Sequence, residues 1–559
     1  MSLLPTIRLL LALCCCLFVS ALVSSSSADV SPPRVSLLYS VQHGEGFSLR
    51  RDAFVRMGVA LMFLGASSDR PWQLVLPPLS SSLSPHWTSG VRHSGVSFRG
   101  NIPWASLYDM EHLAQQTGVT FVEHAQWSRM NQATIDHMLH FCSFRYDTAF
   151  FDEARLAVKE GRAAPNSSHP RAQLFLEFPC DATPPAAGFC GTPLPAVSHS
   201  ADKSGVSVWT SEYGSLRLSQ PRSQSVHCGL ANLQPIVLPN ILRDYVSAST
   251  SAVLVSNVQL VFWPPQPYPG TRPDPNEPIA VTHAAKTLFL RSLRLEPKLA
   301  AIAHTFIRHA LEASPALPLD SIAARQLLSP CVSASPSLPP YLGFHVRRGD
   351  FLSVHADVVP DLTYLAMQIT RRVRTVRAEL SAAANPVDRD APLLSSRVFV
   401  SSDMSAVEFA ELQRVLQQVP VDDADAGLSR PTVVRFDLES MRISLRAHLT
   451  AEVNAFLDAS IAAASSSDPA VSASATPLTP FHILLLDQYL CESSLSGRGL
   501  VGTHHSYVSE LIWQNRRARG LEPLDKWDKD VLSGGAAQSQ EAVPKANHDA
   551  ASAKVKDEL

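Results

Sequence analysis

The stretch VSLLYSVQHGEGFSLRRDAFVRMGVALMFL, residues 35–64, decides the fold class of this chain. It opens with an apolar run of strand length, Val35 to Val41, which leads into a glycine-containing turn. Apolar residues then recur at spacings of 7, 3, 4 and 3, on one face of a helix: Phe47, Phe54, Met57, Leu61 and Leu64. A strand, a glycine loop and a helix in this order are typical of the first unit of an α/β domain.

Similar patterns continue along the chain. Apolar runs of strand length occupy 74–76, 120–122, 341–346, 397–401, 433–436 and 481–486, and helical patterns cover 106–116, 279–311 and 506–519. A proline-rich stretch at 263–278 divides them into two sets. We therefore predict an α/β protein with two domains, over residues 34–262 and 279–530. Low complexity predicts disorder for 382–396, 459–480 and the tail 533–559.

Composition excludes some classes of function. The 559 residues are 45% hydrophobic and 17% charged, which is enough apolar material for a large core and argues against a disordered chain. The net charge of −3 lacks the basic excess of a protein whose partner is a nucleic acid, so no such partner is predicted.

The two ends of the chain predict where it resides. Residues 1–28 read as a cleaved signal peptide, with a basic Arg8 and an apolar core from Leu9 to Val23 that is short for a membrane span. The last four residues, 556–559, are KDEL, the address bound by the KDEL retrieval receptor. We expect a protein of the endoplasmic reticulum lumen with no membrane span after signal cleavage.

An oxidising lumen changes how the cysteines are interpreted. Three of the nine fall in the signal peptide, and the remaining cysteines are Cys142, Cys180, Cys190, Cys228, Cys331 and Cys491. Their spacing matches no zinc site, so disulfides are the default, with the pairing left open. Asn166 begins the sequon Asn-Ser-Ser and is a candidate for glycosylation.

The most specific internal segment is GFHVRRGD, residues 343–350. On a strand, Phe344 and Val346 share one face, while His345 and Arg347 share the other. The strand is expected to end at Gly349, so that His345 and Arg347 emerge together at its carboxyl edge, where open α/β sheets bind ligands. An arginine there suits a phosphate, although a strand that simply ends in solvated charges remains an alternative.

Two carboxylates are further candidates. Glu45 lies in the glycine loop after the first strand, and Asp487 is placed at the end of the run 481–486, read as a strand. For each, a solvated surface residue is the alternative. Three Asp-x-Asp pairs (388/390, 423/425 and 528/530) lie in polar loop or tail sequence. They are not interpreted as metal ligands, and no metal or other cofactor is predicted.

Six segments together suggest a family. They are GEGFSLRRD (44–52), WQLVLPP (72–78), IPW (102–104), PYLGFHVRRGDF (340–351), RVFVSSD (397–403) and DQYLC (487–491). In this order they resemble the protein O-fucosyltransferases that act on thrombospondin type 1 repeats, over about residues 35–527 and weakly between 142 and 256. The resemblance implies a GT-B fold, in which two Rossmann-like domains face each other across a cleft and the C-terminal one binds GDP-fucose. It also implies inverting, metal-independent transfer to a Ser or Thr hydroxyl of a folded, disulfide-bonded acceptor domain.

The resemblance assigns roles to particular residues. Glu45 would be the catalytic base that an inverting transfer needs, and Arg347 would stabilise the charge on the departing β-phosphate. The implied contacts to GDP-fucose are Gly44, Gly46, Phe47, Ser48, His345, Val346, Asp487, Ser506, Tyr507 and Val508. Asp487 would suit the guanine edge or a ribose hydroxyl. Cys190, or Cys180, with Cys228 resembles a disulfide pair of the family.

The chain also departs from the family pattern. Ser48 stands where the family usually has Asn, and Asn515 replaces an acidic residue. After Gly502-Thr503 the sequence reads His504-His505-Ser506-Tyr507, with one hydroxyl in register at Ser506. These changes bear on donor affinity and rate more than on reaction type.

Two alternative functions follow. One is fucosylation of EGF-like domains, which is disfavoured because that branch resembles GRFGNQ where this chain has GEGFSL. The other is a lumenal binding or quality-control protein that kept the fold and lost turnover, which His504, His505 and Tyr507 would support.

Overall fold

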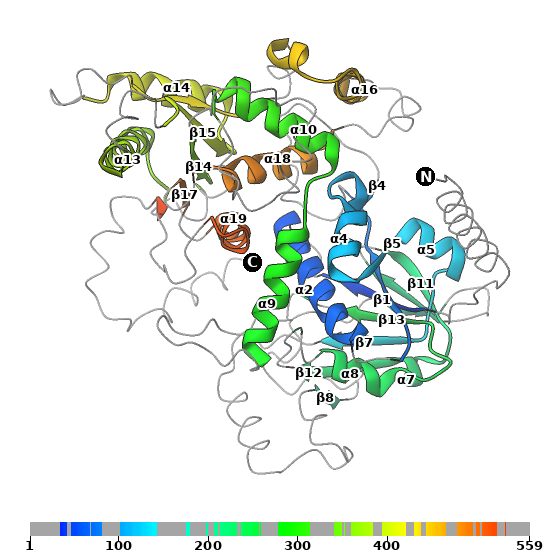
Figure 1. Ribbon diagram of the computed structural model, residues 1–559. Helices are drawn as coiled ribbons and strands as arrows, with labels where there is room; N and C mark the ends of the chain where they lie inside the picture. The colour runs from blue at the N-terminus through cyan, green and yellow to red at the C-terminus, as the bar shows by residue number, and fades with distance from the viewer. Residues whose placement is uncertain are drawn as a thin grey trace, which may run out of the picture.

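The computed structural model describes two α/β halves. The described residues are 34–41, 46–66, 69–80, 101–141, 175–178, 197–199, 206–210, 213–231, 235, 238–256, 258, 278–313, 340–348, 352, 359–383, 394–420, 430–437, 443–465, 478–495, 499–503, 506–521 and 531–532. The five-stranded sheet of the C-terminal half lies at the upper left of Figure 1, and the larger sheet of the N-terminal half at the lower right.

The N-terminal half is built on a seven-stranded sheet with the order β5-β2-β1-β13-β7-β12-β8. Its strands are β1 (Val35–Ser40), β2 (Trp72–Leu76), β5 (Thr120–Glu123), β7 (His137–Phe141), β8 (Phe175–Phe178), β12 (Val226–Ala231) and β13 (Ala252–Ser256). All pairings are parallel except that of β8 with β12. Buried on both faces, β1 is a continuous apolar run rather than an alternating one, as parallel strands usually are. The strands predicted at 35–41, 74–76 and 120–122 are confirmed.

Helices cover one face of this sheet, and a small second sheet covers the other. The helices are α2 (Phe47–Gly65), α4 (Met110–Thr117), α8 (Leu238–Tyr245) and α9 (Pro278–Ser292). The opposite face carries α5 (His124–Asn131) and a four-stranded sheet with the order β6-β11-β10-β9, in which only β6 and β11 pair in parallel. Its strands are β6 (Thr134–Ile135), β9 (Val197–His199), β10 (Val206–Thr210) and β11 (Gly214–Leu218). Shorter elements are β3 (Leu79–Ser80), β4 (Asn101–Ile102), the 3-10 turn η2 (Trp104–Ser106) and α7 (Arg222–Ser225).

The C-terminal half has a five-stranded, fully parallel sheet with the order β16-β15-β14-β17-β18. Its strands are β14 (Leu342–Val346), β15 (Arg397–Ser402), β16 (Thr432–Val434), β17 (Leu500–Thr503) and β18 (Val531–Leu532). One face packs against α13 (Leu362–Ala383) and α14 (Ala406–Gln418). The other face packs against α18 (Pro480–Glu492), with α19 (Tyr507–Ala518) beside it.

The remaining elements of this half are α10 (Pro297–Thr305), the π-helical turn η5 (Phe306–Ala310), the 3-10 turn η8 (Arg446–His448) and α16 (Ala451–Ser465). Two predictions of disorder are wrong at their edges, because α13 extends through Ala383 and α16 through Ser465. The two halves correspond to the two sets of sequence patterns except at α9, which follows the proline-rich stretch but packs on α2 and α4 of the N-terminal half. The limits of the predicted domains, 34–262 and 279–530, stay predictions.

The run 481–486 is helical, so the strand predicted there is wrong. A short apolar run does not distinguish a buried strand from a buried helix. Two local signals favour the helix: Pro480 stands at its first position, and the Thr479 side chain forms a capping box with His482. The helix is apolar on nearly all sides because α18 is buried between the C-terminal sheet and the N-terminal half.

One hydrophobic core passes through both halves. It includes Leu37 of β1 and Phe54 of α2 in the N-terminal half, and Phe399 of β15 and Leu486 of α18 in the C-terminal half. The helices α9, α18 and α19 lie between the two sheets in Figure 1. Among the described residues, no helix combines the length and apolar character needed to cross a bilayer.

Candidate functional site

The strand order of the C-terminal sheet marks a ligand site. The chain passes from β14 to β15 and β16 on one side, then returns as β17 on the other side of β14. Such a reversal opens a crevice beyond the carboxyl ends of the two strands, and ligands of open α/β sheets bind there. Arg347 follows β14 at this point, and the turn into α19 follows β17.

Thr503 and Ser509 lock the end of β14. The Thr503 hydroxyl donates to the His345 carbonyl and accepts from the Arg347 amide, both at 2.8 Å. His345 Nδ1 lies 2.7 Å from the Ser509 hydroxyl on α19, and burial, with a smaller effect of Arg347, lowers the pKa of His345 to about 3. His345 is therefore a neutral, buried side chain beneath α19.

The predicted alternation of faces on β14 is confirmed, but His345 does not emerge at the sheet edge as expected. Val346 joins the core under α13 and α14, opposite His345, and its carbonyl accepts from Ser402 at 2.8 Å. The strand ends at Val346 rather than at the predicted Gly349, which lies outside the described residues. Of the two basic side chains expected there, Arg347 alone reaches the edge.

Arg347 is held by a carboxylate from the next strand. Its guanidinium lies 3.0 Å from Asp403, whose second oxygen accepts from the Arg348 amide at 2.7 Å. A quarter of the Arg347 side chain stays exposed, so an anion in the crevice can approach it. Asp403 belongs to the segment RVFVSSD, but sequence reasoning gave it no role. Its position directly after β15 was the available signal.

The first turn of α19 lies at the same crevice. Ser506 is its N-cap residue, and the free amides of a helix N-terminus attract anions. Gly502 makes the close approach possible, because a Cβ there would lie 2.5 Å from Trp513 on α19. Tyr507 is partly exposed, and Val508 packs against the main core. The predicted residues Ser506, Tyr507 and Val508 therefore follow β17 as one helical turn.

The start of α2 is packed against α18. Gly44 and Glu45 lie outside the described residues, whereas Gly46 is the N-cap residue of the helix. Phe47 is buried, with its ring centroid 5.4 Å from that of Phe481. The Ser48 hydroxyl lies 3.5 Å from the Gln488 amide. The chain directly after Glu45 is thus fixed on a helix of the C-terminal half.

Asp487 is a partly buried residue of α18, not a residue at a strand end. Among the described residues, its Oδ1 atom has no hydrogen-bond partner. Burial raises the pKa of Asp487 to about 8, an effect that nearby Arg435 partly offsets. A buried polar atom without a partner is costly and fits a group that a ligand would satisfy.

The first turn of α19 brings the two candidate centres together. Ser509 contacts His345 of β14, and the Tyr507 hydroxyl donates to Asp52 of α2 at 2.6 Å. The helix that follows the Glu45 loop and the strand that carries Arg347 therefore meet on one turn. No group of three or more metal-ligating side chains occurs within the described residues, and the three Asp-x-Asp pairs lie outside them.

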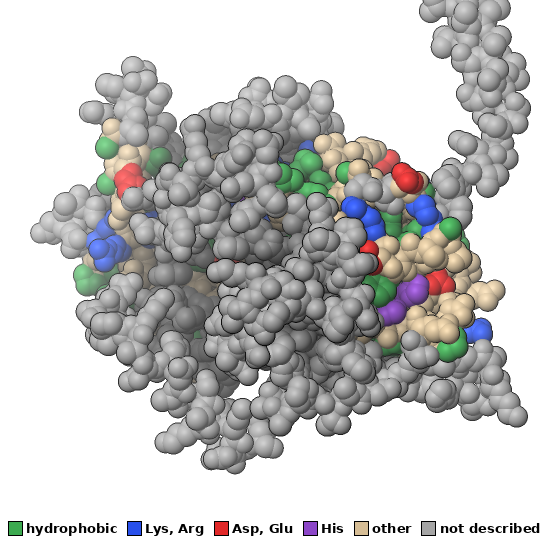
Figure 2. Space-filling view, turned by 90° about the horizontal axis from the view of Figure 1, so that it is seen from below, with side chains coloured by type: hydrophobic (Ala, Val, Ile, Leu, Met, Phe, Trp, Pro, Cys, Tyr) green, Lys and Arg blue, Asp and Glu red, His purple; other side chains and the backbone are tan. Residues whose placement is uncertain are grey.

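The described cysteines differ in state. Cys228 is disulfide-bonded, whereas Cys491 is a buried free thiol, contrary to the default expectation for it. Cys180 and Cys190, the expected partners of Cys228, and the sequon at Asn166 lie outside the described residues, so these predictions stay predictions. On the face in Figure 2, the described residues at the right carry basic and acidic side chains near one another.

Comparison with known proteins identifies similar chains of nearly the same length. The chain is 22% identical over 511 residues to GDP-fucose protein O-fucosyltransferase 2 of Homo sapiens, covering 90% of this chain and 89% of that protein. The Pan troglodytes protein of the same name is 23% identical over 514 residues, with the same coverage. The Drosophila melanogaster protein of that name is 37% identical over 87 residues, 15% of this chain and 16% of that protein.

The predicted resemblance is confirmed. No protein-family model matches the chain. The mixed α/β structure with two parallel sheets is consistent with a Rossmann-like glycosyltransferase.

Proposed function

We propose that this chain is a GT-B glycosyltransferase that moves fucose from GDP-fucose to a Ser or Thr hydroxyl of folded thrombospondin type 1 repeats. The names of the relatives support O-fucosyltransferase activity. The observation that carries the proposal is the first turn of α19, which contacts both β14 beside Arg347 and the helix after Glu45.

The phosphate end of the donor would lie in the crevice beyond β14 and β17. Arg347, oriented by Asp403, would bind the β-phosphate and stabilise the charge that develops as GDP departs. The N-terminus of α19 adds a favourable dipole at the same place. The Asp487 Oδ1 atom, which has no partner among the described residues, would accept a hydrogen bond from the guanine edge or from a ribose hydroxyl.

Glu45 would act as the base. Inversion requires one group to take the proton of the acceptor hydroxyl on the face of the sugar opposite GDP. The oxygen then forms a bond to the anomeric carbon while the bond from that carbon to the β-phosphate oxygen breaks. No metal is assigned to this step, because Arg347 and the helix dipole supply the positive charge.

The acceptor and the compartment belong to the same proposal. A lumenal protein meets folded, disulfide-bonded domains, and the signal-like segment at 1–28 with KDEL at 556–559 supports residence in the endoplasmic reticulum through the KDEL receptor. Deletion of 556–559 should send the protein into the culture medium; a deletion variant that stays in the cell would contradict the retrieval role.

A transfer assay tests the function. Purified protein is incubated with GDP-fucose and either a folded thrombospondin type 1 repeat or a folded EGF-like domain. We expect fucose on the thrombospondin repeat, a loss of at least about 100-fold in kcat for Glu45→Gln, and the same rate after EDTA treatment. Transfer to the EGF-like domain alone would reverse the acceptor assignment. Transfer to neither would leave a binding protein and overturn the enzyme.

Arg347 can be tested against its neighbour. Arg347→Ala should lower kcat by about 100-fold or more, because the leaving phosphate loses its cation. Arg348→Ala is the matched control, since that guanidinium pairs with Glu408 on α14, at 3.3 Å, rather than facing the crevice. Equal losses in the two variants would contradict the role of Arg347.

A further inference from the structure

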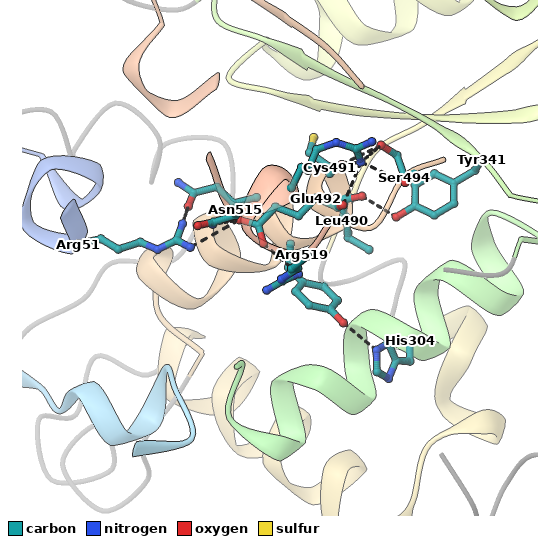
Figure 3. A network of polar contacts seen from close by, with 12 residues as sticks. Arg51, His304, Tyr341, Leu490, Cys491, Glu492, Ser494, Asn515 and Arg519 are labelled. Atoms are coloured by element: carbon teal, nitrogen blue, oxygen red, sulfur yellow. Dashed lines mark hydrogen bonds and ion pairs between the residues drawn. The ribbon is translucent and has the colours of Figure 1, made fainter. Parts of the chain in front are cut away.

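Arg51 joins the two halves through a buried contact. It lies on α2 and is 4% exposed. Its guanidinium donates to Gln488 Oε1 at 2.8 Å and lies 3.5 Å from Glu492 Oε1, and both partners are on α18. Arg51 and Gln488 are 437 residues apart in the sequence. Figure 3 shows Arg51 reaching from α2 toward Glu492 and Asn515.

Glu492 is the centre of this contact. Its second oxygen lies 3.2 Å from the Arg519 guanidinium, and the Asn515 amide donates to its first oxygen. An acidic residue at 515, as in the resembling family, would place a second carboxylate against Glu492. With Asn515 the buried group contains one carboxylate, two guanidiniums and an amide, so Glu492 can bind both arginines.

The residue after Arg51 makes a second contact between the halves. Asp52 accepts from the Tyr507 hydroxyl at 2.6 Å and pairs with Arg56 on its own helix. The consecutive residues Arg51 and Asp52 of α2 therefore bind α18 and the first turn of α19, respectively. These contacts have exact donors and acceptors, which hold one relative position of the helices more specifically than apolar packing does.

The residues of α2 that contact the C-terminal half lie on one face of the helix and extend to its first turn. Ser48, Arg51 and Asp52 lie three and four residues apart, on one face of α2 that is turned toward α18 and α19. Phe47, at the start of the same helix, rests on Phe481. Glu45 precedes the helix by two residues, so the contacts of Arg51 fix the helix start that directly follows it in the chain.

We propose that Arg51 is a positioning residue for transfer: its bonds to Gln488 and Glu492 set the place of α2, the helix that follows Glu45 in the chain, relative to the half that holds the nucleotide. This rests on the proposed function. A displacement of about 1 Å between reacting groups can cost about 100-fold in rate, so the bond matters for catalysis as well as for folding.

The test separates nucleotide binding from turnover. Arg51→Met removes both bonds, and Arg51→Lys keeps the charge but cannot satisfy two partners with one planar fork. The matched control is Arg414→Met, which removes an arginine whose exposed partner, Glu411, lies on the surface of α14. For each variant, kcat for transfer, the KM for GDP-fucose, and the affinity for GDP by calorimetry are measured well below the unfolding temperature.

We expect kcat to fall about 30- to 100-fold in Arg51→Met and about tenfold in Arg51→Lys, while GDP affinity changes by less than about threefold. Arg414→Met should match the wild type. Once Arg51 is methionine, Glu492→Gln should lower kcat by a smaller factor than it does in the wild type, because one of the contacts that it removes is already lost.

Three results would count against the proposal. Unchanged kcat in Arg51→Lys and Arg51→Met overturns it, and so does a parallel loss of kcat and GDP affinity, which indicates general disruption. Should Arg51→Met fail to fold, Arg51→Lys decides on the same criteria. A wild-type protein without transfer overturns the proposed function and this inference together, whereas an active wild type with unaffected variants overturns only the inference.

Discussion

At the scale of single residues, the site depends on side chains whose charge is set by their surroundings. Arg347 is oriented by Asp403, and a quarter of its side chain is exposed. His345 is held neutral by burial, so at neutral pH it supplies a fixed hydrogen-bonding group rather than a second cation beside the phosphate. The cationic charge expected from this strand is therefore concentrated in Arg347.

Asp487 gives a prediction about pH. Burial raises its pKa to about 8, so the carboxyl is mostly protonated at pH 6 and increasingly ionised at pH 8. If it accepts hydrogen bonds from the guanine edge, the ionised form binds and its pKa falls on binding. GDP affinity should then rise by about tenfold between pH 6 and pH 8, with proton release to the buffer. Calorimetry in buffers of different ionisation enthalpy measures both quantities.

Asp487→Asn serves as the control for that experiment. It cannot titrate, so its GDP affinity should be weaker and should vary less with pH than that of the wild type. A wild-type affinity that is constant from pH 6 to pH 8 would contradict a contact between Asp487 and the nucleotide.

At the scale of elements, α2 and α9 pack unusually closely at a glycine. A Cβ on Gly58 of α2 would lie 2.1 Å from the Phe289 ring of α9. Replacing a helical glycine with alanine normally stabilises a protein by about 0.5–1 kcal/mol. Here the sign should reverse, because Phe289 is fully buried and the added methyl must displace its ring.

We therefore expect Gly58→Ala to lower the free energy of unfolding by about 1–3 kcal/mol, as overpacked cores do. Gly65→Ala is the matched control at the end of the same helix, since a Cβ there meets nothing within 4 Å. It should be neutral or slightly stabilising. Urea denaturation of both variants tests this, and a stabilised Gly58→Ala would contradict the close packing.

Helices and strands were predictable from the sequence where their own residues show apolar periodicity or a start or stop signal. β1, α2 and β14 followed from apolar periodicity. α19 ends at Ala518, two residues before Gly520, which has the left-handed conformation typical of a helix stop and was the predicted end signal. α18 was assigned wrongly because the run 481–486 is apolar except for His482, and the Thr479-Pro480 start signal was overlooked. The partners of Arg51 could not be predicted, since nothing local relates residues 437 positions apart.

In the candidate site, too, single residues could be predicted from the sequence, whereas contacts between distant segments could not. Arg347 and the turn before α19 are neighbours because β17 pairs with β14, and this pairing is known only from the structure. β17 itself was not predicted, because LVGT is short and contains a glycine. Asp403 was visible as a residue but not as the partner of Arg347.

At the scale of the whole molecule, the halves share one core and cannot expose it separately without a large cost. Apolar side chains from α2, α9, α10 and α18 form one continuous cluster that reaches both sheets. We expect a single calorimetric unfolding transition, with equal calorimetric and van't Hoff enthalpies. GDP should raise the midpoint temperature of the entire transition. At a GDP concentration 100 times its dissociation constant, the free energy of unfolding should increase by about 2.7 kcal/mol.

Two separate transitions, only one of them shifted by GDP, would contradict a shared core. Expression of 34–262 and 279–530 as separate chains is the complementary control. Each should be insoluble alone, because each would expose the apolar side chains that now meet at α18.

The free thiol of Cys491 has a consequence for how such opening could be observed. Cys491 lies on α18 with no solvent exposure, and burial raises its pKa well above the ordinary value, so the reactive thiolate is suppressed in the closed molecule. A thiol-alkylating reagent can reach it only when α18 separates from its surroundings. The rate of labelling at Cys491 would therefore measure how often α18 separates from the C-terminal sheet, because Cys491 Sγ lies 3.9 Å from the Phe344 carbonyl of β14.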